Sequence, residues 1–345
     1  MYGVSGMLLN AIRSFYAESE ACVRVCRKES EWFGVEVGLR QGCVMSPWLF
    51  NVFMDGVMRE IRVTAGEIGV RLIDDRSKHE WIVEWLMFAD DTVLLGDDEM
   101  KLQRLVNEFG RVCKKRKLTV NAEKSKVMKV SKNGDQNELN INLNGRRMEE
   151  VNAYRYLGVD VTNDGKMNEE VNHRIGEAKK VSGGLQKLWK KRCVSRESKV
   201  GMYEGIVEPS LLYGCEAWGL NVHERKRIEA VEMNCLRNIC GVRRTDRVRN
   251  EEIRRRCRKK ASVGERMDQS ILRWFGHVER MEDDRLARKV YESEMQGPRC
   301  RGRPRKGWMD GVKEVLSKRG LNIQEAKECV QDRREWRSVC RGEMT

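Results

Sequence analysis

Two adjacent carboxylates, Asp90 and Asp91, are the residues of this 345-residue chain whose types and spacing point most clearly to chemistry. Apolar residues precede them at 87–89 and follow them at 93–95. Two like charges beside apolar strands repel each other and lose hydration, so a divalent cation is their natural partner. Mg²⁺ binds through one or two carboxylates together with phosphate oxygens. The pair therefore predicts a Mg²⁺ (or Mn²⁺) site for phosphoryl transfer, with ordinary turn chemistry as the alternative.

The elements around this pair read as a hairpin. The segment EWIVEWLMFA at 80–89 is apolar on both faces of a strand, and a second strand resumes at 92–95. A strand that is apolar on both faces is typically buried on both faces. We therefore expect a buried hairpin that carries the two carboxylates at its tip.

A loop and three helices complete the first half of the prediction. A helix is expected at 7–20, followed by strands at 22–26 and 32–37 around a turn at 27–30. Glycines mark a loop that begins at residue 38, and the Ser46-Pro47 pair suits the capped start of a helix. Asp97 and Asp98 open a helix whose apolar stripe runs from Leu102 to Cys113.

The chain changes character near residue 165. Further strands are expected near 126–130, 139–143 and 154–161, and nearly all of the rest reads as helix. The predicted fold class is therefore α+β, with an antiparallel sheet and packed helices followed by a mainly helical region.

The positive charge belongs to the helical half. The formal net charge is +14; residues 1–150 hold 23 basic and 23 acidic residues, and residues 151–345 hold 44 and 30. This excess predicts a polyanionic partner, with nucleic acid ahead of membrane lipid. No apolar run approaches the ~18 residues of a membrane span, and the N-terminal residues do not resemble a secretory signal.

The 12 cysteines are irregularly spaced and include no C-x-x-C pair. Cys235, Cys240 and Cys257, with His277, come nearest to a zinc-ligand pattern, but Cys235 is in helical phase with core residues. Free thiols in a reducing compartment fit better, which predicts a nuclear or cytoplasmic protein that is not secreted.

Several motifs in order carry a resemblance to a known family. FADDTVLL at 88–95, preceded by GLRQGCVMSPWLFNVFMD at 38–55 and followed by KLTVNAEKSKVM at 117–128 and YRYLGVDV at 154–161, closely resembles the reverse transcriptases of non-LTR (LINE-like) retrotransposons. Later stretches resemble the C-terminal region of these proteins. The resemblance implies a partial palm at 1–165, a basic thumb-like helical region at 166–296, and a basic linker with C-terminal helices at 297–345.

The same resemblance implies roles for individual residues. Asp90 and Asp91 would be catalytic metal ligands, Lys124 the general acid, and Phe88 would pack near the nucleotide sugar. The incoming nucleotide and template would be bound by Gln41, Gly42, Ser46 and Pro47. The primer grip would be formed by Tyr156, Leu157 and Gly158. The implied partners are an RNA template, a DNA primer or duplex, and dNTPs, with no membrane and no predicted protein partner.

One feature of the family has no counterpart in this sequence. Such polymerases use a third carboxylate on a palm strand before the RQG segment, and only 37 residues precede Gly38. The acidic residues among them lie in the wrong context, and the fingers are also missing. We therefore expect little or no polymerase activity from this chain; the alternatives are a non-catalytic nucleic-acid-binding protein and a decayed reading frame.

The basic half holds two further candidate motifs. Arg301-Gly302-Arg303-Pro304, with Arg305 and Lys306 after it, resembles an AT-hook that lies in a narrow minor groove, or forms a solvated linker. RRRCRKK at 254–260 is a phosphate-binding patch, a nuclear-import signal or an exposed helix end.

Overall fold

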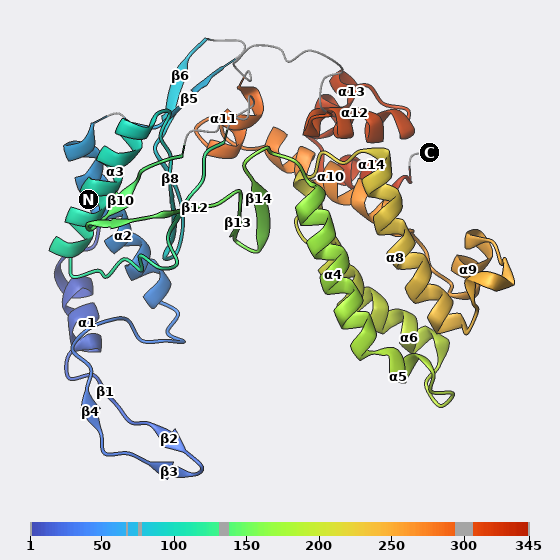
Figure 1. Cartoon of the computed structure of the whole chain (residues 1–345), viewed down its shortest axis with the longest axis horizontal. Helices are drawn as coiled ribbons and strands as arrows, with labels where there is room; N and C mark the ends of the chain where they lie inside the picture. The colour runs from blue at the N-terminus through green and yellow to red at the C-terminus, as the bar shows by residue number, and fades with distance from the viewer. Residues whose placement is uncertain (1, 67, 75–77, 131–137, 294–305, 344–345) are drawn as a thin grey trace. The chain divides into compact units, whose positions relative to one another are not determined.

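The computed structural model describes residues 2–66, 68–74, 78–130, 138–293 and 306–343 (Figure 1). The chain divides into two compact units, Met1–Gly66 with Met87–Thr92, and Glu67–Leu86 with Val93–Thr345. Short strands dominate the part before residue 165 and helices the part after it. The predicted α+β class is confirmed.

The first unit begins with helix α1 (Gly6–Tyr16) and a ribbon of two nested antiparallel strand pairs. Their strands are β1 (Glu20–Ala21) with β4 (Phe33–Gly34), and β2 (Arg24–Val25) with β3 (Lys28–Glu29). The predicted turn at 27–30 is wrong, because the chain reverses at Cys26-Arg27. Both residues have positive φ, +49° and +66°, as in the two-residue turns whose twist matches that of the strands. Neither residue is the glycine or asparagine that usually indicates such a turn in a sequence.

Helix α2 (Ser46–Ala65) completes this unit. It begins at the Ser46-Pro47 pair, as predicted, with proline in the first turn, where its missing N–H costs no hydrogen bond. One face is buried, at the helical spacing of Met54, Val57, Met58, Ile61 and Ala65.

The hairpin of β7 (Trp85–Phe88) and β8 (Asp91–Leu94) belongs to both units. Its tip, Met87–Thr92, is part of the first unit, and its base is part of the second. The expected single strand over 80–89 is wrong, because the chain is divided at Glu84. Residues before Glu84 form β6 (Glu80–Val83), which pairs antiparallel with β5 (Val70–Ile73) instead.

In the second unit, helix α3 (Glu99–Lys115) packs against short strands. Asp98 accepts a hydrogen bond from the backbone N of Lys101 at 2.8 Å and so caps the helix, as its sequence predicts. Strand β9 (Lys126–Val127) pairs in parallel with β12 (Glu149–Glu150). Two antiparallel pairs accompany it, β10 (Asn142–Leu143) with β11 (Arg146–Arg147), and β13 (Ala153–Tyr156) with β14 (Val159–Thr162). Val106, Val127, Ile141 and Leu143 form the core between α3 and these strands.

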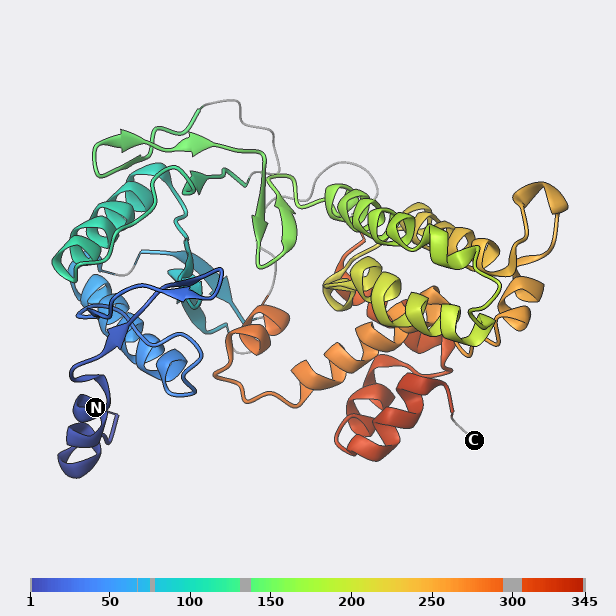
Figure 2. The ribbon, with the colours of Figure 1, turned by 90° about the horizontal axis from the view of Figure 1, so that it is seen from below.

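Helices make up the rest of the second unit (Figure 2). In chain order they are α4 (Asn168–Gly184), α5 (Gln186–Trp189), α6 (Arg196–Met202), a π-helix (Tyr203–Val207), α7 (Glu208–Leu212), α8 (Val222–Cys240), α9 (Asn250–Arg256), α10 (Val263–Glu279), α11 (Leu286–Glu292), α12 (Trp308–Lys318), α13 (Ile323–Cys329) and α14 (Arg333–Arg341). Helices α4 and α8 run side by side (Figures 1 and 2).

Two apolar cores hold these helices. The first lies among α4, α6, α7, α8 and α9, and its fully buried side chains include Tyr203, Leu211, Ile228 and Leu236. The second lies between α10 and the C-terminal helices, around Phe275 and Trp336. Asn221, Ser262 and Asn322 form capping boxes with the glutamate three residues on, which fixes where α8, α10 and α13 begin.

Candidate functional site

The carboxylate pair stands at the turn of the β7–β8 hairpin. Ala89, with φ +52°, and Asp90 form the two-residue turn, and Asp91 begins β8. The predicted burial is wrong. Phe88 is 64% exposed and both aspartates are exposed, while the strand residues Trp85–Met87 and Thr92–Leu94 are only half-buried. Within the described residues these two strands pair only with each other, so neither is the central strand of a larger sheet.

The loop before α2 is held by two residues of the sequence motif, Arg40 and Ser46, together with partners from the segment at 15–19. The Oγ of Ser46, a buried residue, donates to the carbonyl of Arg40 at 2.8 Å and lies 2.8 Å from the Tyr16 hydroxyl. Ser46 therefore does not cap the helix with its side chain, contrary to the expectation. The guanidinium of Arg40 lies 4.6 Å from the centre of the Phe15 ring and donates to Ser19 at 2.9 Å.

These contacts leave the middle of the loop open. Gln41 is exposed, and Gly42 has φ +83°, a conformation that favours glycine. Hydrogen bonds from the Met45 backbone and the Ser46 side chain lower the pKa of the Cys43 thiol. Gln41, Gly42, Ser46 and Pro47 lie in the same compact unit as Phe88, Asp90 and Asp91.

The other predicted site residues belong to the second unit. Lys124 is exposed in a turn, and its backbone N donates to the side chain of Asn121 at 3.1 Å. Tyr156, Leu157 and Gly158 lie at the β13–β14 turn, where Leu157 and Gly158 have φ of +49° and +80°.

Two side chains that sequence reasoning missed anchor the β13–β14 turn. The Tyr213 hydroxyl donates to the Leu157 carbonyl at 3.0 Å, and the Arg174 guanidinium donates to the Gly158 carbonyl. Arg174 also stacks 4.8 Å from the Tyr213 ring and pairs with Glu170 at 2.5 Å. No pattern near residue 158 announces these partners, because they come from α4 and from the end of α7.

The basic motifs are only partly available as free charge. Arg301, Arg303 and Arg305 lie outside the described residues, and Lys306 pairs with Glu314, whose pKa this contact lowers. In RRRCRKK, Arg254 pairs with Glu232 at 2.8 Å, and both Arg255 and Arg256 pair with Glu252 at 2.8 Å. The last two contacts hold the pKa of Glu252 at about 2.

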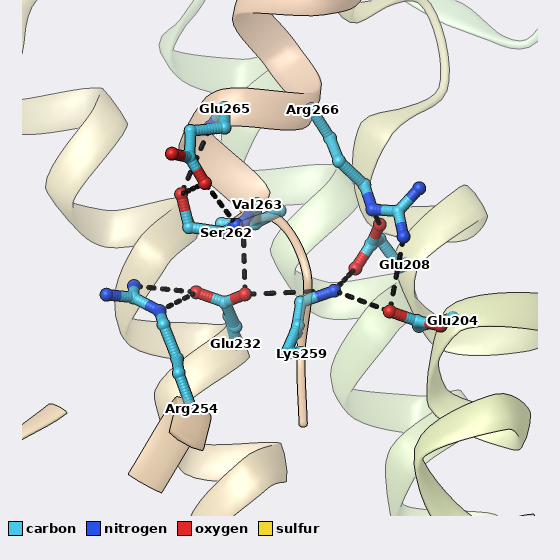
Figure 3. A network of polar contacts seen from close by, with 9 residues as sticks. All are labelled: Glu204, Glu208, Glu232, Arg254, Lys259, Ser262, Val263, Glu265 and Arg266. Atoms are coloured by element: carbon cyan, nitrogen blue, oxygen red, sulfur yellow. Dashed lines mark hydrogen bonds and ion pairs between the residues drawn. The ribbon is translucent and has the colours of Figure 1, made fainter. Parts of the chain in front are cut away.

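Lys259, from the same motif, is the centre of a buried charge network (Figure 3). Its side chain is fully buried, and its Nζ lies 2.6 Å from Glu208, 3.2 Å from Glu204 and 4.0 Å from Glu232. Arg266 pairs with Glu208 at 2.5 Å, and Glu232 also accepts from the backbone N of Val263 at 3.0 Å. Burial outweighs these partners and raises the pKa of Glu232.

The donor set around Asp90 and Asp91 fits a metal ion only in part. Two neighbouring exposed carboxylates match the way Mg²⁺ is held jointly by protein and phosphate oxygens. Across the described part of the chain, however, no group of three or more His, Cys, Asp or Glu side chains is placed to hold a metal. The pair therefore supplies a ligand set for one shared ion and not for two.

The N-terminal part of the chain matches a known family. Residues 3–161 match the family described as reverse transcriptase (RNA-dependent DNA polymerase), and this range contains every candidate residue of the loop, hairpin and primer-grip turn. Together with the relatives below, this match shows that the N-terminal part of the chain is similar to the reverse transcriptases of non-LTR retrotransposons.

The relatives are proteins of mobile elements. A transposon-derived protein of Caenorhabditis elegans is 25% identical, over 75% of this chain and 96% of its own length. The RNA-directed DNA polymerase from mobile element jockey of Drosophila melanogaster is 25% identical over 81% of the chain, and the Pol polyprotein of the type-1 retrotransposable element R2 of Nasonia vitripennis is 24% identical over 52%. The chain spans 30% of the jockey protein and 17% of the R2 protein.

No helix among the described residues is both long and apolar enough to cross a membrane.

Proposed function

We propose that this chain is a nucleic-acid-binding protein of the reverse transcriptase family that keeps part of a polymerase active site. The carrying observation is that the hairpin tip with Asp90 and Asp91 and the Gln41–Pro47 loop lie in one compact unit inside the matched range. In this proposal 1–165 is a partial palm, 166–296 a thumb-like region, and 297–345 a basic linker with C-terminal helices.

The site residues have distinct roles in the proposal. Asp90 and Asp91 hold Mg²⁺ (or Mn²⁺) together with phosphate oxygens of a dNTP, and the ion supplies charge stabilisation for phosphoryl transfer. The exposed ring of Phe88 offers an apolar surface to the sugar. Gln41 and Gly42 leave room for the nucleotide and template, and the start of α2 favours an anion. Lys124 is the proposed general acid, and Tyr156, Leu157 and Gly158 are the proposed primer grip.

Two carboxylates are too few for efficient polymerisation. Two-metal catalysis clamps both the attacking and the leaving oxygen, and the described residues provide ligands for one ion at most. We therefore propose that the chain by itself incorporates nucleotides poorly or not at all.

Primer extension on poly(rA)·oligo(dT) with Mg²⁺ or Mn²⁺ tests this proposal. We expect background incorporation from the wild-type chain. Robust incorporation by the wild type, lost in Asp90→Ala and kept in Asp283→Ala, would refute the proposal of low activity. It would show that two carboxylates suffice for catalysis. Asp283 is a matched control because its side chain is 92% exposed and distant in sequence from the hairpin.

Binding without catalysis is the second candidate function, and one feature favours it. Several exposed cations of the helical half make no ion pair within the described residues, and six of them lie at 190–192 and 244–249: Lys190, Lys191, Arg192, Arg244, Arg247 and Arg249. If they contact about six phosphates, log K falls with log salt at a slope of about −5. Anisotropy with an RNA–DNA duplex measures this slope, and Asp90→Ala should leave it unchanged. A flat dependence on salt would remove nucleic acid as the partner.

A further inference from the structure

Two thiols meet where α8 and α9 end. Cys240 is the last residue of α8 and Cys257 follows the last residue of α9, 17 positions later. Their Sγ atoms are 3.3 Å apart. Both cysteines are free, Cys257 is buried and Cys240 is partly exposed.

The local fold holds the two chain segments together. Gly241, in the left-handed region with φ +66°, ends α8 and reverses the chain. Arg237, one turn before the end of α8, then donates to the Val248 carbonyl at 3.0 Å and to the Asn250 side chain at 2.7 Å. These contacts fix the start of α9 against α8, so the thiol pair does not depend on a freely moving loop.

Cys240 also has the environment of a reactive thiol. A hydrogen bond from Cys257 and the positive charges of Arg196 and Arg256 lower the pKa of Cys240 to about 7. The thiolate is the nucleophile in thiol–disulfide exchange, so this lowered pKa favours Cys240 as the attacking thiol. By contrast, burial raises the pKa of Cys235 on the same helix, and of Cys215 to about 12.

We propose that Cys240 and Cys257 form an oxidation site, which a low-molecular-weight disulfide converts into an intramolecular disulfide. The distance between the sulfurs has to close from 3.3 Å to about 2.05 Å. The sulfurs are thus within about 1.25 Å of bonding distance, on segments that the Arg237 contacts already hold together.

The exchange is balanced in two steps. The Cys240 thiolate attacks one sulfur of the small disulfide, the S–S bond of the reagent breaks, and one small thiolate leaves with its electron pair. Cys257 then loses its proton and attacks the Cys240 sulfur, which expels the second small thiolate. The two cysteines are oxidised and the reagent is reduced to two small thiolates, of which one takes the Cys257 proton and the other is protonated from solvent.

The disulfide would enclose the segment that holds several free cations. Arg244, Arg247 and Arg249 all lie between the two cysteines and are exposed. The cross-link would therefore fix both ends of this arginine-rich segment, while adding no charge to it. The inference does not depend on the proposed function, because it rests on the thiol geometry alone.

Peptide mapping of the full chain after treatment with oxidised glutathione tests the proposal. The reduced protein is treated at pH 7.5, remaining thiols are alkylated, and a non-reducing tryptic digest is measured by mass spectrometry. We expect residues 238–243 joined to residues 257–258 as the main cross-linked product. Cys257→Ala should instead keep one glutathione on Cys240, because the second attack is lost, and Cys240→Ser should leave Cys257 unmodified.

Cys235→Ser is the matched control, since Cys235 lies on α8 but its Sγ contacts Ser182 at 3.3 Å. This variant should form the same cross-link to the same extent as the wild type. Glutathione found only on the exposed Cys26 and Cys193, with no 238–243/257–258 product, would overturn the proposal. Equal glutathione uptake by Cys240 in the wild type and in Cys257→Ala would overturn it as well.

Discussion

Replacing Lys259 with methionine removes the central charge of the buried network and keeps a side chain of similar length. In the wild type, Lys259 Nζ lies 2.6 Å from Glu208 and 3.2 Å from Glu204 (Figure 3). The Lys259 side chain has no exposed surface. It also lies 5.1 Å from the centre of the Tyr203 ring. Lys259→Met therefore leaves buried carboxylates facing an apolar side chain.

The size of the effect follows from the partners that remain. Removing one member of a buried ion pair costs about 3–5 kcal/mol, because the other charge stays buried. Glu208 keeps Arg266 at 2.5 Å, and Glu232 keeps Arg254 at 2.8 Å. We therefore expect the lower end, about 3 kcal/mol. Since whole domains are stable by about 5–15 kcal/mol, this is a large fraction of the free energy of unfolding.

Urea unfolding followed by circular dichroism at 222 nm measures this change in the helical unit. With an m-value of about 3 kcal/mol per M, the midpoint should fall by about 1 M. The matched control is Arg258→Met, one residue earlier, whose pair with Glu197 is 81% and 64% exposed. An exposed pair contributes little, so this variant should stay within about 0.5 kcal/mol of the wild type.

A second substitution separates charge from packing. Adding Glu208→Gln to Lys259→Met removes a buried carboxylate that has lost one of its two cations, so the double variant should be more stable than Lys259→Met alone. A loss below about 1 kcal/mol in Lys259→Met, an equal loss in Arg258→Met, or no recovery in the double variant would refute the reasoning.

Two shorter predictions concern packing and pH. Gly276→Ala in α10 should destabilise the C-terminal helices by about 1–3 kcal/mol, because the added Cβ overlaps the Trp336 indole, which donates to the Leu272 carbonyl at 3.1 Å. The control is Gly311→Ala, where the added Cβ meets open space. Equal thermal midpoints for the two variants would contradict the prediction. Contacts with Lys166 and Thr162 lower the pKa of Asp164 from 3.8 to about 2. The contribution of Asp164 to stability is therefore full above about pH 4 and is lost as the pH falls to about 2. Asp164→Asn should flatten this part of the stability profile, which urea midpoints from about pH 2 to 6 would measure.

The elements that the sequence predicted best are those fixed by local signals. Helix α3 begins at its Asp98 cap and buries the predicted apolar stripe, and the β13–β14 turn falls within YRYLGVDV as expected. These features depend on residues within a few positions of one another, which periodicity and capping describe well.

The errors arose where partners far along the chain decide the outcome. The apolar run at 80–89 reads as one strand, yet its halves pair with different neighbours on either side of Glu84. The β13–β14 turn is held by Tyr213, 56 positions after Leu157. A residue pattern within one segment carries no information about such a partner, so neither the anchoring nor the exposure of the hairpin tip was predictable.

The basic run at 254–260 is a further case in which distant partners decide the outcome. By count, residues 254–260 are the densest basic run of the helical half, and a phosphate-binding patch was a natural hypothesis. Yet Lys259 is buried among glutamates, and Arg254 and Arg255 are paired within the protein. Because a paired or buried cation releases few counterions on binding a phosphate, the salt dependence should instead follow the unpaired cations at 190–192 and 244–249. Neutralising Arg244 and Arg247 should therefore lower the salt slope by about 2, while Arg255→Gln should change it far less.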